Sequence, residues 1–157
     1  MNEQIYAVLM ALDGDTLLLP NSAVVEVISR EAVRPAEDVP PWMLGNYEIN
    51  GRRVPVVSFE ALNGGQRPQD ARRSRVVILH SFGKHLEAHA LGVLTQGYPH
   101  LVTLNRNAVR AAELRSTDRD DLVLSRVRIA SQDAAIPDLE TIESDLLRLE
   151  FTGSAVV

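Results

Sequence analysis

The sequence predicts an all-β domain that ends in one amphipathic helix. Glycine and proline divide most of the chain into short apolar segments, a spacing that is typical of β-barrels and sandwiches. The chain has 157 residues, of which 45% are hydrophobic, and this is the size and composition of one domain with its own core. We therefore expect a single domain over residues 1-157, with lobes at 14-66 and 75-136, a helix at 137-150 and a frayed tail at 152-157.

Nine strands are expected, at 4–12, 16–19, 24–28, 46–49, 54–59, 75–82, 89–94, 101–104 and 123–130. Asp13-Gly14 and Asn50-Gly51 predict hairpins, because a type I′ turn needs positive φ at both central residues. Gly83-Lys84 predicts a third hairpin. Pro55 lacks an N–H, so its strand is expected at a sheet edge or at a bulge.

The terminal helix is predicted from apolar residues spaced three, four and three apart, namely Leu139, Ile142, Leu146 and Leu149. Pro137 suits the first helical position, and the acidic residues after it suit the positive end of the helix dipole. A second, shorter helix is expected at 105–114.

Composition excludes several classes of protein. The chain has no cysteine, which removes disulfides, thiolate metal sites and cysteine nucleophiles. The formal charge of −5 argues against a broad phosphate-binding surface. The longest apolar run, at 5–12, is too short to cross a bilayer, and the first residues lack the cationic start of a signal peptide. A cytoplasmic protein that is not inserted in a membrane is expected.

The sequence carries no recognisable reaction centre, and neither an enzyme nor a cofactor or metal site is expected. His85 and His89 lie four residues apart. The segment is predicted to be a strand, however, and in a strand that spacing separates the two side chains by about 13 Å, too far to share a metal ion. The acidic residues at Asp13 and Asp15, and those at 118–121, are expected to be solvated loop residues.

Residues 17–62 nevertheless carry a specific pattern. It runs Leu-Leu-Leu-Pro-Asn-Ser-Ala-Val-Val-Glu-Val-Ile at 17–28, Pro-Pro-Trp-Met-Leu-Gly at 40–45 and Asn-Gly-Arg-Arg-Val-Pro-Val-Val-Ser-Phe at 50–59. This pattern resembles the CheW-like domain, the adaptor of bacterial chemosensory arrays. The residues at 17–21, 41–45 and 57–60 are most similar to those of the ChpC-like branch, which belongs to systems that control type IV pili and twitching motility.

The resemblance implies two small five-stranded SH3-like β-barrels side by side, with a hydrophobic groove between them and no active site. It also implies an adaptor that links the tip of a methyl-accepting chemoreceptor to the regulatory domain of a histidine kinase. Recruitment to membrane-associated receptor arrays would follow, and nucleic acid is not an implied partner.

Carried over to this chain, the receptor-facing groove falls on Val8, Val24 and Val27, with Glu26 beside them. Four positions depart from the family pattern, among them Glu48 in place of a common asparagine and Ser58 in place of a common aspartate. Asn21 replaces a common aliphatic residue of the groove, and Asn50 stands where the family usually has an arginine. Val25 is expected in the core.

An alternative reading rests on the cationic loop that contains Arg67, Arg72, Arg73 and Arg75. In that reading the protein is a small β-barrel that binds nucleic acid or another ligand through this loop, and binding should fall steeply with salt.

Overall fold

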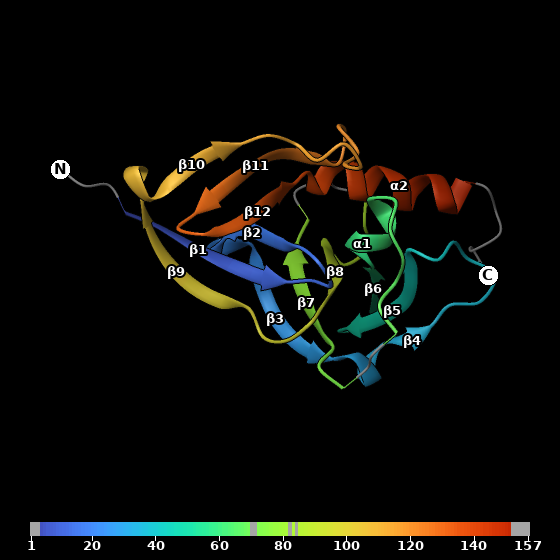
Figure 1. The fold of residues 1–157 in the computed structure, drawn as a ribbon. Coiled ribbons are helices and arrows are strands. Elements are labelled where there is room, and N and C mark those ends of the chain that lie inside the picture. Colours follow the sequence, from blue (N-terminus) through green and yellow to red (C-terminus); the bar gives the residue numbers. More distant parts are fainter. Residues whose placement is uncertain (1–3, 70–71, 82, 84, 152–157) are drawn as a thin grey trace.

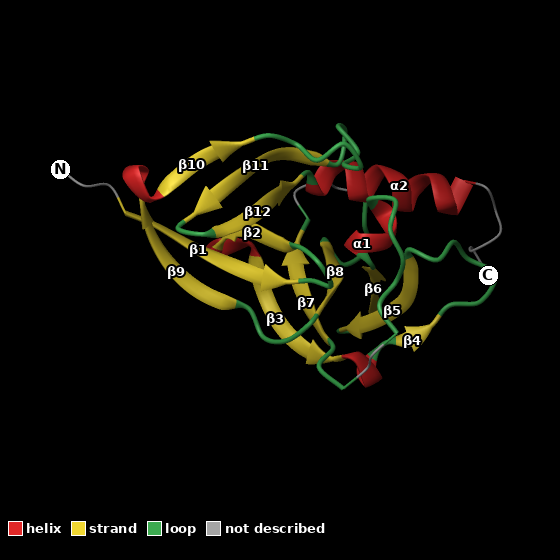
Figure 2. Ribbon diagram, viewed as in Figure 1, coloured by secondary structure: helices red, strands yellow, loops and turns green. Residues whose placement is uncertain are grey.

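The computed structural model describes residues 4–69, 72–81, 83 and 85–151, and it contains two six-stranded sheets with one long helix, α2 (Leu139–Phe151) (Figure 1). Strands account for most of the fold, and α2 lies along one side of it (Figure 2). The prediction of an all-β domain with a C-terminal helix is confirmed. The predictions for Phe82, Lys84 and the tail at 152–157 fall outside the described residues.

One sheet, here the terminal sheet, combines strands from both ends of the chain. Its order is β10-β11-β12-β2-β1-β9. All neighbours in it pair antiparallel except β2 and β12, which are parallel through Leu17 and Ala135. Its strands are β1 (Gln4–Ala11), β2 (Thr16–Pro20), β9 (His100–Asn105), β10 (Val109–Ala112), β11 (Val123–Ile129) and β12 (Gln132–Pro137).

The other sheet, here the central sheet, comes from one continuous part of the chain. Its order is β3-β7-β8-β6-β5-β4, with β6 and β8 parallel and the other neighbours antiparallel. Its strands are β3 (Val24–Ser29), β4 (Arg34–Pro35), β5 (Met43–Ile49), β6 (Arg52–Val57), β7 (Arg75–His80) and β8 (Ala90–Thr95).

Each sheet has six strands, and the strands of the central sheet lie between β2 and β9 of the terminal sheet along the chain. The reason lies in β1, which is apolar on both faces. Ala7 and Leu9 pack into one core cluster, whereas Val8 and Met10 pack into another. A strand buried on both faces takes a position inside a sheet, and the β1–β2 hairpin lies between β9 and β12.

The largest core cluster joins both sheets and α2. It includes Met10 from β1, Val77 from β7, Leu91 from β8, and Ile142 and Leu146 from α2. The two helical residues are among those whose spacing predicted the helix. Burying that stripe against both sheets therefore fixes α2 across the junction between them.

Four local predictions need correction. Pro137 ends β12 instead of starting the helix, and Asp138 caps α2 by accepting a hydrogen bond from the Glu140 amide at 3.1 Å. The end of the strand expected at 54–59 is a short helix, α1 (Phe59–Leu62), capped by the Ser58 hydroxyl, which accepts from the Ala61 amide. His89 precedes β8 in a turn with φ +54°, so the strand expected at 89–94 starts one residue later.

The helix expected at 105–114 is wrong. Asn105 caps a single 3₁₀ turn, η3 (Arg106–Ala108), and the chain then continues as β10. β10 pairs with β11 from Val109 to Ala112, so tertiary pairing overrides the helix propensity of the two alanines. The structure also contains β12, which the sequence analysis did not anticipate.

The hairpin prediction at Asn50-Gly51 is confirmed by φ values of +52° and +77°. Pro55 lies in an interior strand rather than at an edge. The pairing of β6 with β8 covers only Val56 and Val57, however, so the proline precedes the part of β6 that is paired on both sides.

Across the described segments, α2 included, the structure shows no helix with the length and apolar character needed to cross a membrane.

Candidate functional site

The predicted partner-binding residues centre on β3, an edge strand of the central sheet. β3 pairs with β7, and the register shifts between Val24 and Glu26, which marks a β-bulge. The bulge breaks the alternation of inward and outward side chains. Val25 is consequently 42% exposed, whereas Val24 and Val27 are half-buried against the largest core cluster. The expectation that Val25 belongs to the core is therefore wrong.

Glu26 is exposed between these valines and contacts the opposite part of the sheet. The Tyr47 hydroxyl on β5 donates a hydrogen bond to the Glu26 carboxylate, and burial together with this negative charge raises the pKa of Tyr47. β3 and β5 are separated by three strands in the sheet order, so the sheet must curl to bring them together. Glu26 thus lies near a tyrosine of β5 while its neighbours on β3 are valines. We call Val24, Val25, Glu26 and Val27 the β3 patch.

Val8 is placed differently from the expectation that it lines an open groove. It is 2% exposed in the largest core cluster and pairs with Leu101 on β9. The neighbouring apolar residues of this strand pair are the exposed ones, since Leu101 is 71% and Tyr6 is 63% exposed. Tyr6 shares the face of Val8, because side chains alternate along a strand. The sequence missed both, since the continuous apolar run at 5–12 gave no signal of which residues reach the surface.

The two asparagines lie in separate places. Asn21 is exposed in the 3₁₀ turn η1 (Asn21–Ala23), directly before β3. Asn50 is exposed in the β5–β6 turn, where its side chain is suited to positive φ. Val24, Glu26 and Val27 are thus on one strand, Asn21 adjoins it, and Val8 lies beneath the surface in the core that Val24 and Val27 contact.

Two of the carboxylates that were expected to be solvated, Asp15 and Asp118, instead have enclosed side chains that are 10% and 0% exposed. The Arg126 guanidinium is 2% exposed and donates hydrogen bonds to Asp15 at 2.8 and 2.9 Å and to Asp118 at 2.6 and 2.8 Å. Asn63 also donates to Asp118 at 2.9 Å. These hydrogen bonds hold the pKa of Asp118 well below its ordinary value, while burial acts in the opposite direction. We call Arg126, Asp15 and Asp118 the Arg126 cluster.

This arrangement is structural rather than catalytic. General acid–base chemistry needs a carboxyl group whose pKa lies near the working pH, whereas the hydrogen bonds from Arg126 and Asn63 lower the pKa of Asp118. It connects the turn after β1 with β11 and with the loop before β11. The sequence gave no signal of it, because Asp15 and Arg126 are 111 residues apart in the chain.

The four histidines are exposed and distributed over several elements. Within the described ranges, no three or more His, Asp or Glu side chains are grouped closely enough to hold a metal ion. The structure thus directs attention to surfaces rather than to a reaction centre, and chiefly to the β3 patch.

Comparison with known proteins agrees with this architecture. The family model described as the CheW-like domain matches residues 7–146. No curated protein matches the chain. Among solved structures, the crystal structure of the scaffolding protein TtCheW from Thermoanaerobacter tengcongensis is similar, with a TM-score of 0.70 and 16% sequence identity over 87% of this chain and 90% of that chain. Because the family model matches most of the length of this chain, the chain belongs to the CheW-like domain family.

Proposed function

We propose that the protein is a non-enzymatic chemosensory adaptor that links the tip of a methyl-accepting chemoreceptor to the regulatory domain of a histidine kinase. The observation that carries the proposal is the β3 patch, in which a bulge on an edge strand exposes Val25 between the half-buried Val24 and Val27. Family membership and the likeness to a scaffolding protein support the same role.

In this proposal, the receptor contributes a helix whose apolar side chains lie on Val24, Val25 and Val27, the helix-in-groove mode of recognition. Glu26 adds a negative charge beside these valines, close to Tyr47, and this charge favours one orientation of the partner. A single patch of this size supports only modest affinity, and an array of many adaptors strengthens it through multivalency.

The kinase domain would contact a different part of the molecule. The outer strands β4, β9 and β10 have backbone groups on one side that are not paired within the two sheets. Such edges suit pairing with a related β domain. The two partners can then bind at the same time, which an adaptor requires.

The resemblance of residues 17–21, 41–45 and 57–60 to the ChpC-like branch supports a role in type IV pili and twitching motility. We infer a cytoplasmic protein recruited to receptor arrays at the membrane. Deleting its gene should reduce twitching, and a fluorescent fusion should form clusters that disappear when the receptor is absent.

The direct test titrates the purified chain with the receptor tip and, separately, with the kinase regulatory domain from the same cell. Val25→Asp places a charge on the β3 patch and should weaken receptor binding by about tenfold, because a desolvated carboxylate opposes an apolar contact. Binding to the kinase domain should remain unchanged.

Leu124→Asp is the matched control. Leu124 is 61% exposed, and it also lies at a register shift, between Val123 and Ser125 on β11 of the terminal sheet. The Leu124→Asp variant should bind the receptor tip and the kinase domain as tightly as the unmodified chain does. Equal receptor binding by the Val25→Asp and Leu124→Asp variants would refute the β3 patch, and absence of binding to both partners by the folded protein would refute the adaptor role.

A further inference from the structure

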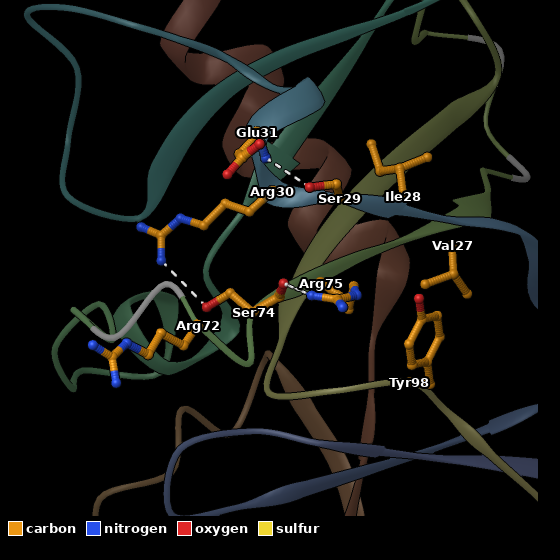
Figure 3. Close-up of a pocket in the computed structure, with 9 residues that line it drawn as sticks. All are labelled: Val27, Ile28, Ser29, Arg30, Glu31, Arg72, Ser74, Arg75 and Tyr98. Carbon is orange, nitrogen blue, oxygen red and sulfur yellow. Dashed lines mark hydrogen bonds between the residues drawn. The ribbon is translucent and has the colours of Figure 1, made fainter.

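A cleft with cationic walls lies beside the end of β3. It has a volume of about 600 Å³ and is formed by β3, the 3₁₀ turn η2 (Arg30–Ala32), the start of β7 and the loop at Tyr98. Figure 3 shows its lining, which includes Arg30, Arg72 and Arg75 around Ser74, with Tyr98 at one side. A local concentration of arginines is unexpected on a protein whose net charge is −5.

Ser74 organises two of these arginines. Its side chain is 1% exposed; its hydroxyl accepts a hydrogen bond from Arg30 Nη1 at 3.4 Å, and its carbonyl accepts one from Arg75 Nη1 at 2.9 Å. The Arg75 guanidinium also lies 5.0 Å from the centre of the Tyr98 ring, in cation–π contact. In Figure 3, Arg30 and Arg72 extend to one side of Ser74, and Arg75 lies on the other side with Tyr98.

Arg30 and Arg75 retain unused hydrogen-bonding capacity. A guanidinium has five N–H donors, and the hydrogen bonds above occupy one in each residue. Neither residue forms an ion pair with any carboxylate in the described part of the chain, whereas six other arginines do. Glu31 lines the same cleft, but among the described residues it forms no ion pair with Arg30 or Arg75.

The geometry selects a class of ligand. Cations on both sides of Ser74 suit a ligand with several separated negative groups rather than one phosphate. Val27, Ile28 and the exposed Tyr98 ring add an apolar rim that suits a polypeptide. The overall charge of −5 repels a long polyanion such as nucleic acid, but it acts less strongly on a few carboxylates held close to arginines.

We propose that this cleft, the Arg30/Arg75 cleft, binds an acidic segment of a partner protein. Carboxylates of the segment pair with Arg30 and Arg75, and an adjacent apolar side chain lies on Tyr98. Arginine suits this task because its planar group forms paired hydrogen bonds with a carboxylate. The proposal goes beyond receptor recognition by the β3 patch and does not depend on it.

The test uses the full chain and a fluorescent peptide that repeats Glu-Glu-Leu-Ser, with a Gln-Gln-Leu-Ser peptide as its uncharged counterpart. The acidic peptide should bind, and binding should weaken as salt rises. The double variant Arg30→Gln/Arg75→Gln should lose about tenfold or more in affinity, since charge-assisted pairs are lost. Arg110→Gln, which removes an exposed charge from β10, should bind like the unmodified chain.

Chemical-shift mapping with the same peptide should move the amide signals of Ser29, Ser74 and Tyr98. Equal binding of the two peptides, or unchanged binding by the double variant, would overturn the proposal. Tighter binding of single-stranded DNA, or saturation by inorganic phosphate without any binding of the acidic peptide, would overturn it in favour of a phosphate site. Val25→Asp should leave peptide binding intact, which separates a failure here from a failure of the receptor surface.

Discussion

The Arg126 cluster and the Arg30/Arg75 cleft use the same side chain in opposite ways. Arg126 is almost fully buried and directs four hydrogen bonds at two carboxylates. Arg30 and Arg75 are partly exposed and share one serine as their hydrogen-bonding partner. The two sites differ both in burial and in the number of guanidinium donors that the fold uses, and the second difference decides the role of the arginine. What matters is how many of its donors the fold itself occupies, because unoccupied donors are available to a partner.

The largest effect is expected at Arg126. Arg126→Met should lower the free energy of unfolding by about 3–5 kcal/mol, because it leaves the enclosed Asp118 carboxylate without a cation and leaves Asp15 with only the longer ion pair to Arg115 at 3.7 Å. Urea denaturation followed by circular dichroism measures this change. The triple variant Arg126→Met/Asp15→Asn/Asp118→Asn should recover part of the loss, and a single variant as stable as the unmodified chain would contradict the structural role.

Acid should break the same cluster. The pKa of Asp118 in the folded protein lies below its ordinary value of 3.8, so its ionised form stabilises the fold. That contribution is complete above the unfolded-state pKa and is lost as the pH falls from about 4 through the lower folded-state pKa. Melting temperatures measured from pH 6 downward should fall steeply below about pH 4. The Asp118→Asn variant should show a shallower dependence, and parallel curves would show that other carboxylates are responsible.

Arg119 lies between the two extremes. Its side chain is 31% exposed, and it pairs with Asp145 on α2 at 2.9 Å and with exposed Asp121 at 2.8 Å. Arg119→Gln should cost about 1–2 kcal/mol, mainly through the lost hydrogen bond that ties α2 to the loop before β11. Thermal unfolding monitored by calorimetry tests this value, and a loss as large as that at Arg126 would remove the proposed distinction.

The smallest stability effect is expected in the cleft. Arg30→Gln/Arg75→Gln should change the free energy of unfolding by about 1 kcal/mol or less, because one part-buried hydrogen bond from each arginine and one cation–π contact contribute little. The same double variant should be the most defective in acidic-peptide binding. A large loss of stability would place these arginines with Arg126 as structural residues.

Local signals in the sequence predicted local features well. Asn50-Gly51 has the conformation that a two-residue hairpin requires, and the spacing of Ile142 and Leu146 predicted the buried stripe of α2. The segment at 105–114 failed because its pairing with β11 depends on residues far along the chain. Prediction from local pattern thus worked where the determinants were close in sequence.

The candidate site was harder to predict, because exposure depends on register. The alternating valines of β3 suggested one buried and one open face, but the bulge exposes Val25 instead. Likewise, Val8 lies in the core, and its neighbours Tyr6 and Leu101 reach the surface. The Arg126 cluster assembles residues from distant segments, so no sequence motif marks it. For the cleft, the sequence marked the cationic loop with Arg72 and Arg75, but it gave no sign that Arg30 lies beside them.

The interleaved strand order has a consequence for how the protein is made. All strands of the central sheet lie within residues 24–95, so this sheet can assemble once that stretch has left the ribosome. β1 and β2 are synthesised before the central sheet. Their outer neighbours come later, because β1 pairs with β9 and β2 pairs with β12. The β1–β2 hairpin therefore has an unshielded apolar strand until β9 and β12 have been synthesised, a state that favours aggregation or chaperone binding. Slow completion of the terminal sheet, after fast assembly of the central one, is the folding order that this topology imposes.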